Sequence, residues 1–493
     1  MATARAATMP GRLMRHARMM PSSARLFRLG RWRSMCASTP SAAGRPGRLR
    51  ITHTCATNGV REYVVAPDDE LHSIRTCHPA HSTSSSVAAK LDGMVAATAA
   101  YFLPKGFPSS VGPDYVPYAS WCALAGASSS AGGVLATQSL LLAVGVGTAN
   151  ALPLAASLNW VLKDGIGQLA AVVSAAVISD RFDADPKRWR AIAGLAEAGA
   201  RCLNASTPFA PWAFLPIASL ANLGYSVACL AASATKADFH RSLTRRQNLG
   251  DVTGKAGSQA IAASLVGTAV GLATSAALVT TPTHAMAGCI LFSAGQLFAL
   301  ERSMQNLALP TLTPPVGTSL VNAFLERRPL PSPAELAASQ RHLSEPSVLY
   351  RGGYHASSLS DGMPARIRFG SASIEELAPD ALSLDAVRDA CDGSRHLLSV
   401  DRASAEVRVL MLDGANGDDV LLALLHAGLM RPHVLGAEGS HTDSARLTRA
   451  RLGEARELAP DLSMALEAAG WDLSSALKLE ESPSRVSFTS AEA

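Results

Sequence analysis

Long runs without a charged residue set the pattern of hydrophobic and polar positions in the middle of the chain. No Asp, Glu, Lys or Arg occurs in residues 115–162, 208–235 or 256–300. An α-helix needs about 20 predominantly apolar residues to cross a bilayer, and each of these runs exceeds that length. The pattern therefore predicts a set of long apolar helices between residues 115 and 300.

Local signals divide these runs into segments. Apolar helices are predicted over Gly132–Ala149, over Leu152–Ser179 and over a stretch that begins near Ile217. Asp185 followed by Pro186 is typical of a helix start, with the aspartate as N-cap and the proline in the first turn. The glycines of GDVTGKAGSQ (Gly250–Gln259) predict a turn that caps a helix. Pro282 divides the run after it into the two arms of a helical hairpin.

The first arm of this hairpin holds Gly267 and Gly271, a GxxxG spacing that lets two helices approach closely. Two interpretations of the apolar runs compete. In one, two to six helices span a membrane; in the other, Ala-rich helices form the buried core of a soluble bundle. The length of the runs and their lack of charge favour the membrane, which we expect, whereas their many Ser, Thr and Gly residues favour the soluble bundle.

The pattern changes after Pro310. Residues 311–347 read as a Pro-rich connector around an exposed helix. Residues 348–493 read as an α+β domain, with short alternating runs typical of strands at 365–370, 396–400, 405–412 and 484–488. The second and third of these predict a hairpin, and a helix follows with Asp418 as its cap. The expected fold is mainly α, an Ala/Gly-rich helical core that is membrane-embedded, followed by a smaller C-terminal α+β domain.

Charge is distributed unevenly along the chain. Residues 1–50 hold eleven arginines and no acidic residue, so the net charge of +5 leaves 5 − 11 = −6 for residues 51–493. An Arg-rich, acid-free N-terminus is typical of an organellar transit peptide, which we expect over residues 1–50. The acidic remainder gives no support for nucleic-acid binding. Residues 51–86 read as a disordered linker; its His and Cys residues lack the tight pairs typical of zinc sites, so no metal is expected.

No catalytic signature is present in the sequence. The GDVTGKAGS segment fails as a phosphate loop, because three residues rather than four separate Gly250 from Gly254 and Ala256 follows Lys255. Lys163 and Asp164 are costly in an apolar segment and would face a polar interior or an interface if that segment spans a membrane. Since neighbours on a helix point to different faces, these two are not expected to pair. The chain is expected not to be an enzyme.

Five blocks of sequence together resemble the root UVB sensitive family. They occur in that family's order across residues 87–310, which is taken as the helical family core, and read FLPKGFPSSVGPDYVPY, LATQSLLLAVGVG, NWVLKDGIGQL, DPKRWR and NLGDVTGKAGSQ. The chain departs from the family's pattern at Lys105, which replaces Glu or Gln, and in FALERSMQNLAL, where members tend to have Tyr-Asn-Tyr. Similarity in the C-terminal region is weaker.

The resemblance implies a non-enzymatic organellar membrane protein, in a chloroplast or a mitochondrion, that acts in development and ultraviolet-B responses. It also implies links to vitamin B6 homeostasis and auxin transport, but no cofactor. Expected partners are membrane lipid and a paralogous family protein. The matching polar positions, taken as candidate binding residues, are Asp114, Tyr115, Lys163, Asp164, Asp251, Lys255, Ser258 and Gln259.

Two other functions stay open at this point. The first is a small-molecule carrier of the organelle membrane, in which Lys163 and Asp164 line the path of an unknown ligand. The second is a soluble helical ligand-binding protein or enzyme, whose apolar helices form an ordinary core. The Pro-rich segment Phe102–Tyr118 serves in each case as a rigid entry to the helical core, because proline fixes φ and restricts the residue before it.

Overall fold

The computed structural model describes residues 50–55, 59–65, 71–77, 101–145, 153–178, 182, 185–343, 365–369, 373–378, 381–434, 441–474 and 485–488. The chain divides into two units, Met1–Thr83 and Ser84–Ala493, and each is described by itself. The expected transit peptide lies outside the described residues, except for its last residue, so it stays a prediction.

The first unit contains a three-stranded antiparallel sheet where a disordered linker was expected. Its strands follow one another in sequence order, β1 (Arg50–Cys55), β2 (Gly59–Val65) and β3 (Leu71–Cys77). The strands are rich in Val, Ile, Thr and Tyr, residue types that favour extended backbone. The linker interpretation relied on low-complexity sequence after residue 80 and overlooked this local preference.

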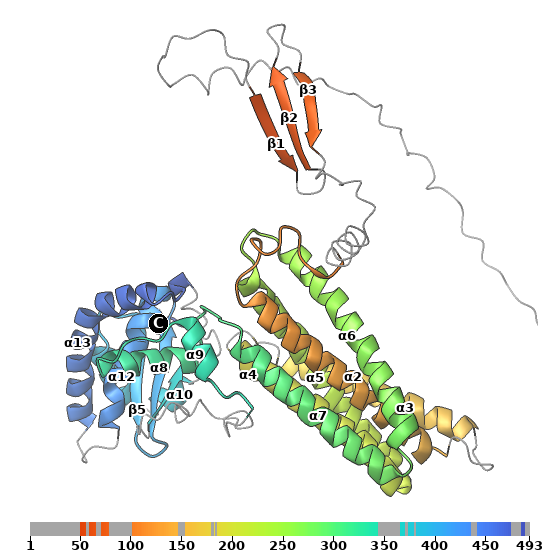
Figure 1. Ribbon diagram of the computed structural model, residues 1–493. Helices are drawn as coiled ribbons and strands as arrows, with labels where there is room; N and C mark the ends of the chain where they lie inside the picture. Colours follow the sequence, from red (N-terminus) through yellow and green to blue (C-terminus); the bar gives the residue numbers. More distant parts are fainter. Residues whose placement is uncertain are drawn as a thin grey trace, which may run out of the picture. The chain divides into compact units, whose positions relative to one another are not determined.

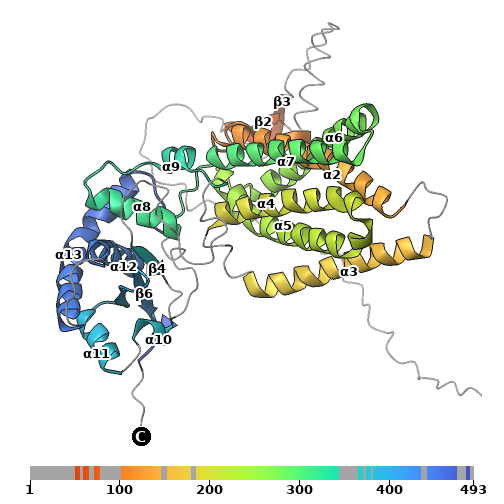
Figure 2. The ribbon, with the colours of Figure 1, turned by 90° about the horizontal axis from the view of Figure 1, so that it is seen from below.

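In the described part of the second unit, six long helices form a bundle. Figure 1 shows these helices lying side by side. They are α2 (Tyr115–Ala143), α3 (Pro153–Ile178), α4 (Pro186–Ser206), α5 (Phe214–Leu243), α6 (Leu249–Leu278) and α7 (Pro282–Gln305). Helix α2 packs against α6 and α7, α4 packs against α5 and α7, and α3 packs against α5. Seen from below, α3 lies on the outer side of α5, away from α6 and α7 (Figure 2).

Two predicted helix boundaries were wrong. Helix α2 begins at Tyr115 and not at Gly132. Pro117 does not prevent this, because it lies in the first turn, where a backbone N–H has no acceptor within the helix. The GDVTGKAGSQ segment is not a turn but forms the first turns of α6, which starts at Leu249. Glycine disfavours a helix by only about 1 kcal/mol per residue, and tertiary packing overrides that preference here.

Other local predictions are confirmed. The Asp185 side chain accepts a hydrogen bond from the backbone N–H of Arg188 at 3.2 Å and so caps α4. The GxxxG pair lies where α6 crosses α2: a Cβ at Gly267 would come 2.1 Å from the Ala127 carbonyl oxygen, and one at Gly271 would come 2.7 Å from that of Ala131. Only glycine allows the two helices to lie this close.

The C-terminal domain combines a small sheet with helices. Its strands β4 (Arg366–Phe369), β5 (His396–Asp401), β6 (Glu406–Leu412) and β7 (Arg485–Val486) form a sheet with the order β4-β6-β5, and β7 also pairs with β6. Its helices are α8 (Pro314–Leu325), α9 (Pro333–Ser339), α10 (Ile374–Leu377), α11 (Ala381–Ala390), α12 (Gly417–Met430) and α13 (His441–Ala468). The predicted β5–β6 hairpin is confirmed, whereas Asn416 and not Asp418 caps α12.

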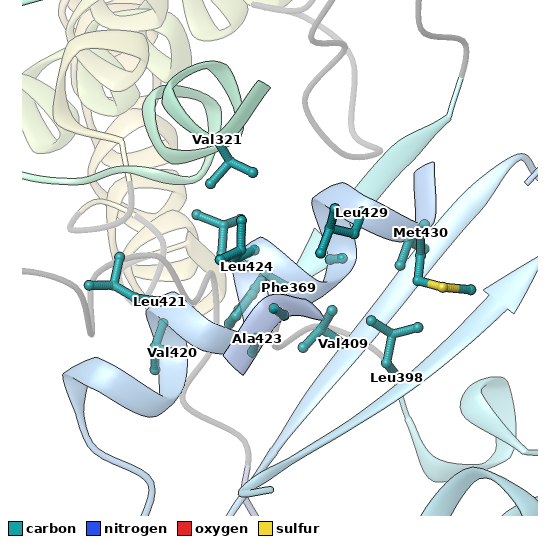
Figure 3. Packing of buried hydrophobic residues seen from close by; sticks show 14 of the residues in the cluster. Val321, Phe369, Leu398, Val409, Val420, Leu421, Ala423, Leu424, Leu429 and Met430 are labelled. Carbon is teal, nitrogen blue, oxygen red and sulfur yellow. The ribbon is translucent and has the colours of Figure 1, made fainter. Parts of the chain in front are cut away.

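Buried aliphatic residues join these elements into one core (Figure 3). Leu398 and Val409 of the sheet lie below α12, and Val321 of α8 packs over it. Gly428 permits this contact, because a Cβ there would lie 2.5 Å from Val321 Cγ1. Helix α8 was expected to be exposed in a connector, but its buried face belongs to the C-terminal core. The prolines on both sides of this short helix are typical of a connector, which is why its apolar face was not predicted to be buried.

Candidate functional site

The Pro-rich segment Phe102–Tyr118, here called the elbow, is tied to both ends of the α5–α6 connection. The Gly112 N–H donates to the Leu243 carbonyl at 2.9 Å, and the Arg245 N–H donates to the Ser110 carbonyl at 3.2 Å. Apolar side chains of the elbow pack with those of α5, α6 and the segment after α7. The elbow is therefore a fixed part of one end of the bundle.

Four of the eight candidate residues hold the elbow in place. Asp251 of α6 accepts a hydrogen bond from the Lys105 N–H at 2.6 Å. Gln259 donates to the Phe102 carbonyl at 2.7 Å and to the Tyr115 hydroxyl at 3.0 Å. Asp114 accepts from the Ala308 N–H at 3.1 Å, which ties the start of α2 to the segment after α7.

The other two candidate residues of α6 are Ser258 and Lys255. The Ser258 hydroxyl donates to the Gly254 carbonyl of its own helix at 3.4 Å, and Lys255 lies one turn after Asp251. Burial raises the pKa of the Tyr115 hydroxyl above its ordinary value. The elbow residues thus bind one another and the backbone, an arrangement that supports a structural role for this group.

Lys163 and Asp164 form a second group on α3. Their side chains pair at 2.5 Å, contrary to the expectation that neighbours on a helix do not pair. Asn222 of α5 donates to the Asp164 carboxylate at 2.8 Å, which draws that side chain around the helix toward Lys163. The lysine is buried against the Trp160 ring, whereas 46% of the Asp164 side chain is exposed.

The two groups do not form one site. On helix α5, Asn222 contacts Asp164 and Leu243 contacts the elbow, 21 positions later. At 1.5 Å per residue these positions are about 30 Å apart along the helix axis. The eight candidate residues are therefore divided between two regions of the bundle.

Sequence reasoning missed a buried polar network centred on α4. The Arg201 guanidinium is almost wholly buried and donates to Ser293 at 3.0 Å, to Gln296 at 2.7 Å and to Ser129 at 2.9 Å. Glu197, one turn earlier, pairs with Arg201 at 3.0 Å and accepts from Gln296 at 2.8 Å. We call these five residues the α4 network; it joins α2, α4 and α7.

A second missed group lies at the start of α4. Lys187 is buried, with 6% of its surface exposed, and three carboxylates act on it electrostatically, those of Asp185, Asp114 and Glu301. His342, in the segment after α9, lies within electrostatic range of the same ammonium. We call these five residues the Lys187 cluster.

Burial lowers the pKa values of both basic groups in this cluster. The pKa of Lys187 falls from 10.5 to about 8, because desolvation outweighs the attraction of the three carboxylates. Burial and the nearby Lys187 lower the pKa of His342 to about 3, so its imidazole is neutral at physiological pH. The cluster therefore contains a lysine that releases its proton far more readily than an exposed one.

One signal in the sequence pointed to α4. It is the polar helix among apolar ones, and Glu197 and Arg201 stand four residues apart, a spacing that places both on one face. The DPKRWR block predicts the cap at Asp185, but nothing in it distinguishes Lys187 from an ordinary residue of the first helical turn. The partners of these residues come from other helices and carry no local signal.

Comparisons with known proteins cover the same bundle. Residues 88–328 match a family model described as "Vitamin B6 photo-protection and homoeostasis domain". Root UVB sensitive 6 of Arabidopsis thaliana is 31% identical over 335 residues, which are 67% of this chain and 62% of that protein. Root UVB sensitive 4 of the same plant is 27% identical, over 79% of this chain and 76% of its own length.

A third relative, "Protein root UVB sensitive 2, chloroplastic" of Arabidopsis thaliana, is 29% identical over 48% of this chain and 54% of its own. No solved structure matches the chain. The elbow, the α3 pair, the α4 network and most of the Lys187 cluster all lie within the matched residues. The model match and the relatives agree with the order of sequence blocks, and the chain is a member of the root UVB sensitive family.

Proposed function

We propose that the chain is an integral protein of an organelle membrane. The observation that carries this proposal is the exposure of apolar side chains on the outside of the bundle. Leu265 of α6, Leu291 of α7 and Val172 of α3 are 67%, 70% and 68% exposed. Within the residues that the structure describes, four helical segments are long and apolar enough to cross a membrane, Leu158–Val177, Pro211–Leu243, Leu249–Leu278 and Pro282–Gln305.

The interior of the bundle supports the same proposal. Its ion pair, Glu197 with Arg201, and its buried Lys187 lie among the helices, while the outward faces carry Leu, Val and Ile. Water-soluble bundles have the opposite distribution, since they bury apolar residues and expose charge. A lipid environment accounts for the distribution seen here, because charges in a membrane protein face the bundle interior and pair there.

The role that we assign is non-enzymatic and lies in vitamin B6 homeostasis and the response to ultraviolet-B light. The family model's description and the relatives' names support it. We extend it to development and auxin transport on family resemblance alone. The organelle is a chloroplast or a mitochondrion, reached by a transit peptide in residues 1–50. Membrane lipid and a paralogous family protein are the partners in this proposal.

Alkaline carbonate extraction of the organelle fraction tests the membrane proposal. We expect the protein to stay in the pellet, because lipid-facing side chains such as Leu265 and Leu291 remain buried in the bilayer at high pH. Release into the supernatant would overturn the proposal and would favour a soluble helical ligand-binding protein. A peripheral membrane protein of the same organelle, released by carbonate, serves as the control.

A carrier of small molecules is the second candidate function. It is favoured by the α4 network, which places an ion pair inside the bundle, with 32% of the Glu197 side chain exposed. Flux of radiolabelled pyridoxal into proteoliposomes would test it. Glu197→Gln is expected to lower the flux more than tenfold, whereas Glu335→Gln on α9 serves as the matched control. Equal flux with the wild-type protein and with empty liposomes would exclude this carrier function.

A further inference from the structure

Lys187 lies at one end of the bundle, beside the point where α7 leaves its apolar segment. Glu301 stands four residues before the end of α7. One turn after Lys187, Ala191 packs with Leu300 and Met304 of α7. The segment after α9 closes this region, because the N–H groups of His342 and Leu343 both donate to the Glu301 carboxylate at 2.9 Å.

Backbone N–H groups fix each carboxylate of the Lys187 cluster in place. Asp185 accepts from the N–H of Arg188, Asp114 from that of Ala308, and Glu301 from the two described above. With three carboxylates, one lysine and a neutral imidazole, the cluster has a formal charge of −2 when Lys187 is protonated.

The amine is more available here than in an exposed lysine. A pKa of about 8 leaves half of Lys187 neutral at pH 8. An ordinary lysine with a pKa near 10.4 is almost wholly protonated at that pH. Buried lysines of this kind are the ones that form imines with carbonyl compounds.

We propose that Lys187 binds a non-phosphorylated aldehyde of the vitamin B6 class as a reversible imine. This inference rests on the proposed role in vitamin B6 homeostasis and assigns a residue and a chemistry to it. The Lys187 nitrogen lone pair attacks the aldehyde carbon, and one amine proton passes to the carbonyl oxygen to give a carbinolamine. The hydroxyl then leaves with the second amine proton as water, and a C=N bond remains. The step needs no oxidant or reductant.

The charge of the cluster determines which aldehyde it accepts. A phosphate ester would bring up to two further negative charges close to Asp114, Asp185 and Glu301, and like charges at short range in a desolvated site repel strongly. A pyridine nitrogen that carries a proton is attracted by the same carboxylates, as it is in enzymes that use an Asp partner for this nitrogen. Pyridoxal therefore fits the cluster better than pyridoxal 5′-phosphate.

The segment that carries His342 controls access to the amine. Besides the two bonds to Glu301, the Gln305 amide donates to the Gln340 carbonyl at 3.2 Å. This segment must move for an aldehyde to reach Lys187. Glu301→Gln weakens its attachment by replacing a charged acceptor, so this variant is expected to form the imine several times faster.

The test uses the full-length protein in detergent with pyridoxal, followed by borohydride reduction and peptide mass mapping. We expect the label on Lys187, its loss in Lys187→Arg and its retention in Lys163→Arg, the matched variant at the other buried lysine of the bundle. The labelling rate of the wild-type protein should rise with a midpoint near pH 8. Each rate is divided by that aldehyde's rate with free lysine, because pyridoxal, unlike its phosphate ester, forms a cyclic hemiacetal in water. The normalised rate for pyridoxal should be at least tenfold that for pyridoxal 5′-phosphate.

Label spread over other lysines and unchanged in Lys187→Arg would overturn the proposal, as would equal normalised rates for the two aldehydes. The pH profile and the aldehyde comparison use only the wild-type protein, so they decide the matter even if Lys187→Arg fails to fold. Equilibrium dialysis with pyridoxine, an alcohol that forms no imine, separates the two proposals. Binding of pyridoxine without label would reject the imine alone, and no binding of either vitamer would reject the vitamin B6 role.

Discussion

The helical bundle and the C-terminal domain place polarity in opposite ways. In the bundle, Arg201 and Lys187 are buried, while Leu265 and Leu291 are exposed. In the C-terminal domain, leucines and valines of the sheet and α12 form the core, and ion pairs such as Arg449–Asp389 lie at the surface. The domain follows the rule for a protein in water, whereas the bundle has the distribution on which the membrane proposal is based.

The C-terminal domain nevertheless buries one polar pair of its own. His396 and His426 are wholly buried, and their ring nitrogens lie 2.9 Å apart. His426 also donates to the Thr448 carbonyl at 3.0 Å, which fixes its tautomer. Both regions therefore hold a buried polar group. The α4 network of the bundle is charged and paired, whereas the histidine pair of the domain stays neutral. The α4 network and the histidine pair can therefore be tested by separate substitutions.

Arg201→Met should have the largest effect. It leaves Glu197 without its cation among helices that provide little water, and breaking such a buried pair lowers the free energy of unfolding by about 3–5 kcal/mol. Denaturation of the purified protein in detergent, followed by the fluorescence of bundle tryptophans, measures this. The double variant Glu197→Gln with Arg201→Met should recover part of the loss. Wild-type stability in the single variant would show that the bundle does not depend on its internal charge.

Acid should destabilise the C-terminal domain next most strongly. Burial lowers the pKa values of His396 and His426 to about 3 and about 4, below the 6.5 of the unfolded chain. The unfolded chain therefore binds more protons, and stability is lost as the pH falls from about 6.5 toward 4. From pH 7 to pH 5 the loss should reach about 2–4 kcal/mol. Hydrogen exchange of β5 and α12 amides measures it.

The control for this pH effect is His396→Leu, which removes one of the two titrating groups. This variant should start less stable at pH 7 but should lose only about half as much stability on going to pH 5. If it loses as much as the wild-type domain, the pair is not the source of the acid sensitivity.

Gly267→Ala should cost an intermediate amount and only in the bundle. The new methyl group would meet the Ala127 backbone, which cannot rotate away, so α2 and α6 must separate at an expected loss of about 1–3 kcal/mol. Gly254→Ala on the same helix is the matched control, since a Cβ there meets no atom within 4 Å. It should be neutral or stabilising in thermal unfolding. Equal stability of the two variants would contradict the close crossing.

Asp164→Asn should have the smallest effect on folding. The carboxylate is 46% exposed, and exposed ion pairs contribute less than about 1 kcal/mol. Because Lys163 is buried and would lose its anion, the expected loss is about 1 kcal/mol, at the upper end of that range. Asparagine also keeps an oxygen that accepts from Asn222. Unchanged stability with lost pyridoxal flux would assign a functional role to this pair, whereas a loss of several kcal/mol would make it a structural element of the α3–α5 contact.

Much of the fold follows from the sequence alone. The uncharged runs predicted the long helices, Asp185 predicted the start of α4, the GxxxG pair predicted a close crossing, and alternation predicted the β5–β6 hairpin. These signals are local, because they depend on the spacing of residues within one element. The order of sequence blocks also sufficed to indicate the family.

Only the tertiary structure decided which side chains meet. Gln259 donates to Tyr115 across 144 residues of chain, Arg201 donates to Ser293 across 92, and Glu301 of α7 accepts from the N–H of His342 across 41. No periodicity encodes such pairs, since they arise when packed helices bring distant residues together. The sequence by itself thus determined the helices and their apolar character, and packing determined the charged interior, because a buried charge must find its partner in space and not along the chain.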